Sequence, residues 1–343
     1  MKKQYLLINC SMLLLNLLCA CNNGEDSTSI LGVADPIYVE SFEQKETLSP
    51  DSLFESDIYY EDFAICDSFV FTGSGAWDVR SLPEWKSLKK IFANGHAYGE
   101  FVQFPKVYKS SFVHENNDLY TIVYDLGNGN VYKTNITKTL ELDTLYIEEV
   151  KHKSKKWLDR YLYINSNEFV TRENTHEMCP KKLTHFVENE IVPNKHFEKL
   201  NEIEVNSEDF NVISALESYN SKNNVIVQAY VFFNIINIIP LDDKEKAITL
   251  CYGNKGIPMD DILTAIERKD FFYEVKTYED FFAVLCLKDV KTPTVQFYDY
   301  EGRPIKEYVL SKPATSFDVD CIHNHLYTHN EEDGVIARYI IEI

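Results

Sequence analysis

The C-terminal part of the chain contains a short segment with the residue types that bind transition metals. It reads CIHNH from Cys321 to His325, and a third histidine follows at His329. Cysteine sulfur and histidine nitrogen are common zinc ligands. The first four residues, however, fall where a hairpin turn is expected, so their side chains should point in different directions. We therefore expect no metal site in this segment, and no cofactor. The residues of the segment that remain as candidate metal ligands are Cys321, His323 and His325.

The signatures of common active sites are absent from the sequence. It contains no HExxH zinc motif, no glycine-rich phosphate loop, no GxSxG nucleophile motif and no EF-hand ligand spacing. Glu100 lies in a glycine-containing segment, and we interpret it as a cap for backbone amides rather than as a catalytic acid. The sequence therefore predicts no catalytic residue.

The N-terminus has the organisation of a secretory signal. Lys2 and Lys3 precede a mostly apolar stretch over residues 6–18. This stretch is too short to cross a bilayer as a helix, which needs about 20 residues. Its size and its basic flank are typical of the apolar region of a signal peptide.

The apolar stretch ends in Leu18-Cys19-Ala20-Cys21, which resembles the lipobox of bacterial lipoproteins. The resemblance implies a signal peptide over residues 1–20 and acylation of Cys21, with palmitate among the acyl chains. The alternatives are cleavage before Cys19 and a plain signal peptide. Residues 21–35 start with a polar, acidic run and are expected to form a flexible tether. The protein would then be exported and lipid-anchored in the outer membrane, on its periplasmic or cell-surface face.

The charge balance limits the possible partners. The chain has 343 residues, with 54 acidic and 34 basic side chains and a net charge of −20. Nucleic-acid binding draws its affinity from a basic surface, so we expect no nucleic-acid partner. The most apolar internal run, Val225 to Leu241, is interrupted by polar residues and a proline. The lipid on Cys21 would thus be the membrane attachment.

The cysteines that follow Cys21 are odd in number, are widely spaced and form no CxxC pair. Three of them end apolar runs, which favours buried free thiols over a disulfide framework. The five are Cys66, Cys179, Cys251, Cys286 and Cys321.

Short strands and turns alternate along the chain. Asn128-Gly129 separates two strand-like runs, which is a strong signal for a hairpin. Further turns are expected at 165–167, 242–244, 301–302 and 330–334. The run AYVFFNIINII over residues 229–239 reads as one strand that is apolar on both faces. Such a strand needs a sheet stacked on each side, as in the blades of a propeller.

The repeated turns and the strands that are apolar on both faces predict an all-β fold of the propeller type over residues 36–343. We expect the N- and C-terminal strands to close the ring, with a strand over 36–42 joining the C-terminal hairpin. A short helix is expected over Asp260 to Lys269, where apolar residues recur at helical spacing. The histidine-containing segment 173–200 is predicted to be an insertion over one mouth of the ring or a solvated loop.

Two segments of the chain, which begin at Ile91 and Phe297, carry recognisable motifs. One has a glycine-rich motif that ends in Glu-Phe, and the other has a Glu-Gly hairpin followed by a Val-Asp pair. The motif residues are Gly95, Gly99, Glu100, Phe101, Gly302 and Asp320. These motifs resemble those of the TolB-like six-bladed β-propeller lipoproteins of Gram-negative bacteria of the Bacteroidota type. The resemblance implies a six-bladed β-propeller of four-stranded antiparallel blades. The resemblance supports the fold, but it does not define a function, because propellers host unrelated functions.

The function that we expect is therefore that of a binding or scaffold module. An outer-membrane lipoprotein of this kind would take an envelope protein, a peptide or a glycan as its partner. The alternative is a propeller hydrolase or lyase that acts on polysaccharide or peptide, with its active site over the central channel.

Overall fold

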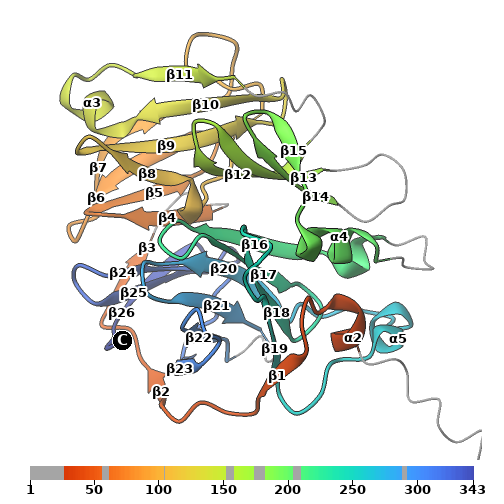
Figure 1. The fold of residues 1–343 in the computed structure, drawn as a ribbon. Coiled ribbons are helices and arrows are strands. Elements are labelled where there is room, and N and C mark those ends of the chain that lie inside the picture. Colours follow the sequence, from red (N-terminus) through yellow and green to blue (C-terminus); the bar gives the residue numbers. More distant parts are fainter. Residues whose placement is uncertain are drawn as a thin grey trace, which may run out of the picture.

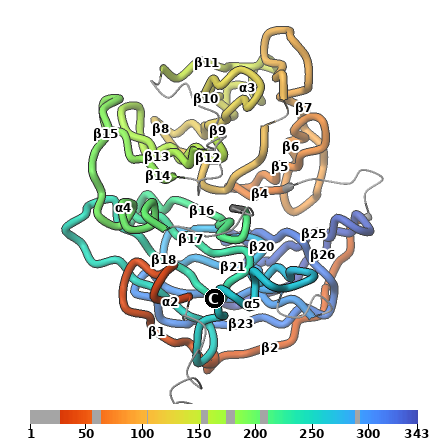
Figure 2. Tube along the Cα trace, turned by 90° about the vertical axis from the view of Figure 1, so that its right-hand side faces the viewer, coloured from red at the N-terminus to blue at the C-terminus, as the bar shows by residue number. Residues whose placement is uncertain are grey.

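The computed structural model describes residues 27–55, 62–103, 105–151, 158–173, 182–203, 210–287 and 292–343. Within these residues the strands form six sheets around a common axis. The predicted six-bladed β-propeller is confirmed. Figure 1 shows the first three blades (orange to green) in one half of the ring and the last three (teal to blue) in the other. Figure 2 shows the same ring turned by 90°.

The first three blades have four antiparallel strands each. Blade 1 contains β4 (Asp62–Cys66), β5 (Phe69–Gly73), β6 (Trp77–Ser81) and β7 (Lys86–Ile91). Blade 2 contains β8 (Phe112–Glu115), β9 (Asp118–Asp125), β10 (Asn130–Asn135) and β11 (Ile147–Val150). Blade 3 contains β12 (Leu158–Asn165), β13 (Glu168–Glu173), β14 (Lys182–Val187) and β15 (Glu190–Val192).

The last three blades combine strands of the C-terminal half with strands of the N-terminal segment. Blade 4 contains β16 (Ala215–Asn220), β17 (Val225–Tyr230), β18 (Ile235–Pro240) and β19 (Ile248–Tyr252). Blade 5 contains β20 (Phe272–Thr277), β21 (Phe282–Cys286), β22 (Thr294–Tyr298) and β23 (Pro304–Leu310). Blade 6 contains β24 (Ser316–Asp320), β25 (His325–His329) and β26 (Val335–Ile340).

The N-terminal segment runs along the outer edges of these last three blades. β1 (Pro36–Val39) adds a parallel strand to β19, and β2 (Lys45–Leu48) adds one to β23. β3 (Ser52–Glu55) then pairs antiparallel with β26 and supplies the fourth strand of blade 6. Closure by N-terminal strands is confirmed, but the strand we assigned to it was wrong. Residues 36–39 extend blade 4, and the strand that joins the C-terminal hairpin is β3.

Burial on both faces of the blade strands is confirmed, although one predicted strand is divided. All residues of β17 and of β18 are buried, and one apolar cluster joins blade 4 (Val227, Ile238) to blade 5 (Phe282, Val284). The run 229–239, which we predicted as one strand, instead turns at residues 231–234. The side-chain amide of Asn234 donates to the carbonyl groups of Tyr252 and Lys255 and so holds the end of this turn in place.

The predicted hairpin turns occur as expected. Residues 126–129, 166–167, 241–247, 299–303 and 330–334 each connect two paired antiparallel strands. Gly129, Gly302 and Gly334 have positive φ angles of 75°, 81° and 69°, which is the backbone region that glycine enters without steric cost. Local turn chemistry therefore sets the hairpin positions.

Short helices flank the sheets in the described residues. They are α2 (Ser27–Leu31), α3 (Ile136–Glu141), α4 (Lys195–Asn201), α5 (Met259–Leu263) and the 3₁₀ turns η1 (Lys109–Ser111) and η2 (Phe210–Ile213). The helix predicted over 260–269 is thus shorter and begins earlier, and Ile266, which we expected on its apolar face, is fully exposed.

Two predicted segments have a different structure from the one we expected. Residues 27–35, assigned to the flexible tether, pack on blade 4, where Leu31 is fully buried and its carbonyl accepts a hydrogen bond from Asn237. The described part of the 173–200 segment is not an insertion over the mouth. It supplies β14 and β15 of blade 3 and most of α4, and His185 is buried in β14, 2.9 Å from Glu168.

Candidate functional site

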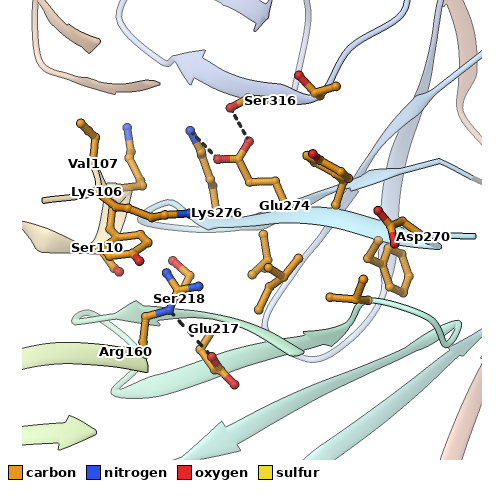
Figure 3. A pocket seen from close by; sticks show the side chains of 18 of the residues that line it. Lys106, Val107, Ser110, Arg160, Glu217, Ser218, Asp270, Glu274, Lys276 and Ser316 are labelled. Carbon is orange, nitrogen blue, oxygen red and sulfur yellow. Dashed lines mark hydrogen bonds and ion pairs between the residues drawn. The ribbon is translucent and has the colours of Figure 1, made fainter. Parts of the chain in front are cut away.

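A cavity of about 330 Å³ opens on the propeller axis, at the end where the innermost strands begin. The first strands of the blades lie innermost, since those of blades 3, 4, 5, 6 and 1 contact one another in turn. The cavity wall comes from the loop before β8 (residues 106–110) and from the starts of β12, β16, β20 and β24. Figure 3 shows these side chains converging on one space. Loops between blades and several innermost strands thus build one site.

The charges in this wall are nearly balanced. Four basic side chains and four acidic side chains line the cavity: Lys106, Lys109, Arg160, Lys276, Glu217, Asp270, Glu274 and Glu331. In Figure 3, Lys106, Arg160 and Ser218 lie toward one end and Asp270 toward the other. Burial raises the pKa of Asp270. The protein as a whole is strongly acidic, but the charges of the cavity wall nearly cancel. Such a wall favours a ligand recognised through hydrogen bonds over a ligand attracted by net charge.

Arg160 and Glu217 form the least satisfied pair in this wall. The guanidinium of Arg160 lies over the ring of Tyr108, 4.1 Å from its centroid. Its Nε lies 3.9 Å from Oε2 of Glu217, and among the described residues neither atom has a hydrogen-bond partner. An oxygen atom that both accepts and donates, such as a hydroxyl, could bridge this separation.

The other oxygen of Glu217 is fully engaged. Its Oε1 accepts from Arg172 at 2.7 Å and from Gln228 at 3.2 Å. Arg172 also pairs with Asp159 of β12. The carboxylate is therefore fixed in orientation, with its second oxygen directed toward Arg160.

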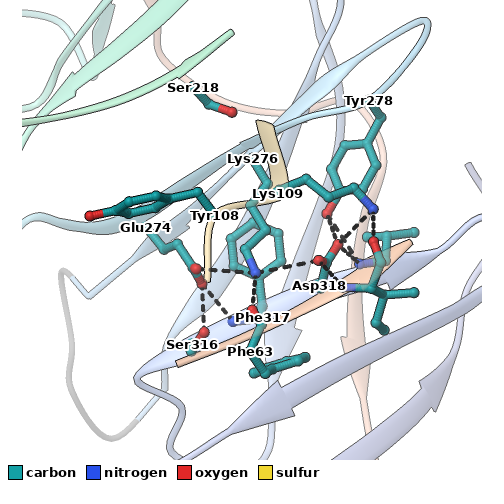
Figure 4. A network of polar contacts seen from close by, with 12 residues as sticks. Phe63, Tyr108, Lys109, Ser218, Glu274, Lys276, Tyr278, Ser316, Phe317 and Asp318 are labelled. Atoms are coloured by element: carbon teal, nitrogen blue, oxygen red, sulfur yellow. Dashed lines mark hydrogen bonds and ion pairs between the residues drawn. The ribbon is translucent and has the colours of Figure 1, made fainter. Parts of the chain in front are cut away.

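A buried polar network, shown in Figure 4, joins blades 5, 6 and 1 beside the cavity. Asp318 of β24 is fully buried and accepts hydrogen bonds from the Ile65 amide at 2.6 Å and from the Tyr278 hydroxyl at 2.8 Å. Lys109 lies 3.5 Å from its Oδ1 and Lys276 lies 3.4 Å from its Oδ2. Burial favours the neutral acid, but the charges of Lys109 and Lys276, together with the hydrogen bonds from Ile65 and Tyr278, lower the pKa of Asp318.

Glu274 connects this network to the cavity wall. Its Oε2 accepts from the Ser316 hydroxyl at 2.9 Å and from the Phe317 amide at 2.8 Å. Its Oε1 lies 3.1 Å from Lys276. Burial raises the pKa of Glu274, although the charge of Lys276 opposes the shift. The network thus holds two acids of opposite pKa shift around one lysine, with all named oxygens hydrogen-bonded.

The glycine-rich motif found in the sequence has a structural role outside the cavity. Glu100 Oε2 accepts from the amide of Ala97 at 2.9 Å, as the capping interpretation predicts. A Cβ atom on Gly95 would lie 1.9 Å from that carboxylate, and Gly99 has a φ of +79°. Phe101 is buried, 5.1 Å from the ring of Phe92. The motif therefore shapes the connection between blades 1 and 2.

Gly302 and Asp320 also serve turns. Gly302 has a φ of +81°, and a Cβ there would lie 2.8 Å from Leu250. Asp320 is buried, and its Oδ1 accepts from the amides of Ile322 and His323. Its carboxylate also lies 2.7 Å from Nδ1 of His323. Each of these residues fixes the geometry of a hairpin.

The C-terminal cysteine and histidine candidates lie in different environments. Cys321 is exposed in the turn between β24 and β25, as the pattern predicts. The rings of His323 and His325 lie 6.2 Å apart, whereas His329 is fully buried next to Phe63. Among the described residues these side chains do not join as three ligands around one point.

The other cysteines of the described residues lie within or at the ends of blade strands. Cys251 and Cys286 are buried and Cys66 is half-buried, and within the described residues none of the three forms a disulfide, as predicted. Cys21 and Cys179 lie outside the described residues, so lipidation of Cys21 stays a prediction. Among the described residues, no helix is both long and apolar enough to cross a membrane.

The cavity residues could not be recognised in the sequence. Lys106, Arg160, Glu217 and Glu274 belong to four separate segments, and only the ring brings them together. Charged residues within innermost strands, such as Arg160 and Glu217, are the one available signal, since buried charges are rare without a partner.

Comparisons with known proteins show the fold and no family. The chain is similar to a crystal structure of a DUF4221 family member from Bacteroides vulgatus, with a TM-score of 0.50 and 8% identity over 86% of this chain and 98% of that one. It is also similar to Raptor from Chaetomium thermophilum, with a TM-score of 0.50 and 12% identity. That match covers 87% of this chain but only 29% of Raptor. No family model matches, and no curated protein matches. The protein is a six-bladed β-propeller.

Proposed function

We propose that this protein is a non-enzymatic binding module, anchored in the outer membrane through a lipid on Cys21. Its partner is an envelope protein, a peptide or a glycan, bound where the axial cavity opens. The observation that carries the proposal is the Arg160–Glu217 pair, whose facing atoms lie 3.9 Å apart in the cavity wall. Both atoms are buried and lack hydrogen bonds within the described residues, so a ligand hydroxyl or amide that bonded to them would remove a desolvation cost.

The second candidate function is a hydrolase or lyase that acts on polysaccharide or peptide at the same cavity. It is favoured by Glu274, which lines the cavity and whose pKa is raised by burial, as in many general acids. It ranks second because both Glu274 oxygens are held by Lys276, Ser316 and Phe317. The neighbouring acid, Asp318, is not part of the cavity wall.

The test is affinity purification of the full chain from membranes in mild detergent, through a C-terminal tag, followed by mass spectrometry. Three proteins are compared: the wild type, Arg160→Leu in the cavity, and Arg303→Leu. Arg303 is an exposed arginine in the β22–β23 turn and serves as the matched control. A partner that is kept by the wild type and the control but lost by Arg160→Leu supports the proposal.

A partner that is retained equally by all three proteins would contradict binding at the cavity. Incubation of the retained glycan or peptide with the wild type then separates the two functions. Cleavage that is abolished by Glu274→Gln would favour the enzyme, whereas unchanged ligand favours the binding module.

A further inference from the structure

The ends of two innermost strands bring together a set of metal-binding side chains that the sequence does not group. Cys66 is the last residue of β4, and Asp67 follows it in the turn to β5 with a φ of +53°. His114 lies near the end of β8, the innermost strand of the next blade. The axial cavity is built from strand beginnings, so this group lies toward the opposite end of the ring.

The three side chains are close enough to share one ion. The Cys66 sulfur, a carboxylate oxygen of Asp67 and a ring nitrogen of His114 all lie within 4.8 Å of one another. The His114 Nε2 and Asp67 Oδ2 atoms are 2.8 Å apart. Zinc–ligand bonds of about 2.0–2.3 Å in a tetrahedron separate the ligand atoms by about 3.4–3.6 Å. Small rotations of the exposed side chains therefore suffice to reach this geometry.

The backbone under the site is held firmly, while its outer side is open. The amide and the carbonyl of Ile65, next to Cys66, bond to Asp318 and Lys109, and His114 is paired with Leu119 in the sheet. The side chains of His114 and Asp67 are 56% and 45% exposed. An ion can thus approach from solvent, and a fourth position is left for water or for a donor from a partner.

The donor atoms of the site suit a transition-metal cation. A metal that binds the Cys66 sulfur displaces the thiol proton. The nearby charge of Lys109 is balanced by Asp318, 3.5 Å away. The mixture of sulfur, nitrogen and oxygen donors suits zinc-like cations rather than magnesium or calcium.

We propose that Cys66, Asp67 and His114 form an open three-ligand site for a transition-metal cation of the Zn²⁺ class, clipping blade 1 to blade 2.

The experiment titrates the chelator-treated full chain, in detergent, with Co²⁺ and follows the sulfur-to-cobalt charge-transfer absorption. We expect one cobalt per chain, displacement of cobalt by Zn²⁺, and a melting temperature that rises when Zn²⁺ is added. Cys66→Ser should remove the charge-transfer band. His114→Asn, a change at an exposed position, should weaken cobalt binding at least tenfold while the metal-free melting temperature stays unchanged.

The matched controls are Cys321→Ser and His323→Ala, which remove the cysteine and a histidine of the C-terminal segment. Both should bind cobalt like the wild type. A band that survives Cys66→Ser, a band lost in Cys321→Ser, or the absence of any band in the wild type would each overturn the site.

Discussion

The Nε atom of Arg160 faces Oε2 of Glu217 across 3.9 Å of the cavity wall without a hydrogen bond. On the other side of the same carboxylate, Arg172 donates to Oε1 at 2.7 Å. One acid thus has two arginine neighbours of different kinds. The Arg172 pair is hydrogen-bonded, whereas the Arg160 pair has no hydrogen bond and is the one that a ligand would bridge under the proposed function.

We expect the two arginines to differ when each is removed. Arg172→Leu should lower the free energy of unfolding by ~3 kcal/mol, because it leaves Glu217 buried without its hydrogen-bonded cation. Arg160→Leu should lower it by ~1 kcal/mol or less, because no hydrogen bond is lost. Urea denaturation of the two variants measures the difference. Equal losses would contradict the assignment.

The network at Asp318 should dominate the stability of the contact between blades 5, 6 and 1. Asp318→Asn removes the negative charge between Lys109 and Lys276 and should lower the free energy of unfolding by ~3 kcal/mol. Asp260→Asn, in the exposed first turn of α5, is the control and should change it by less than ~0.5 kcal/mol. Chemical denaturation checks both values, and a small effect at Asp318 would show that the network contributes little.

His329 should make stability depend on pH in the acidic range. Burial lowers the pKa of His329 from 6.5 to about 4. Between these values the unfolded chain binds a proton that the folded chain does not, so stability falls as pH drops from about 6.5 to about 4. His329→Gln should remove up to ~3 kcal/mol of this dependence. Urea midpoints between pH 4 and pH 7 test it, and an unchanged slope in the variant would refute it.

Closure of the ring should depend on β26. This strand lies between β25 and β3, so a deletion of residues 335–343 exposes both and opens blade 6. We expect the truncated chain to lose its cooperative thermal transition. Removal of Ile343 alone, a half-exposed residue beyond the strand, is the control and should keep a sharp melt. A sharp thermal transition in the chain that lacks residues 335–343 would contradict closure of the ring through β26.

Two glycines with similar backbone angles should respond differently to alanine. Gly75 and Gly99 have φ angles of +68° and +79°. A Cβ on Gly75 meets nothing within 4 Å, whereas a Cβ on Gly99 would lie 2.1 Å from Leu145. Gly75→Ala should therefore cost ~1 kcal/mol of backbone strain, and Gly99→Ala ~2 kcal/mol or more once overpacking is added. Thermal unfolding compares the pair, and equal costs would mean that Leu145 moves freely.

The sequence predicts those features of the fold that depend on residues close together in the chain. The hairpins at Gly129, Gly302 and Gly334 follow from turn residues, and the propeller follows from strands buried on both faces. The turn at residues 231–234 could not be predicted, because it has no glycine or proline and depends on long-range bonds from Asn234.

The remaining errors concern contacts between distant parts of the chain. Parallel pairing of β1 with β19 leaves no signal in either strand. The cavity is equally hidden, because Arg160 and Glu217 meet only when two blades pack side by side. The group of Cys66, Asp67 and His114 combines one local pair with a histidine 47 positions farther on.

The N-terminal segment has a consequence for how the protein is made. Its strands pair with strands that lie about two hundred or more positions later, as the pairing of Pro36 with Thr249 illustrates. Residues 36–55 therefore leave the ribosome long before their partners exist, and contacts of such sequence separation form slowly. β3 can pair only with the final strand, β26, so the ring can close only after translation of the final blade.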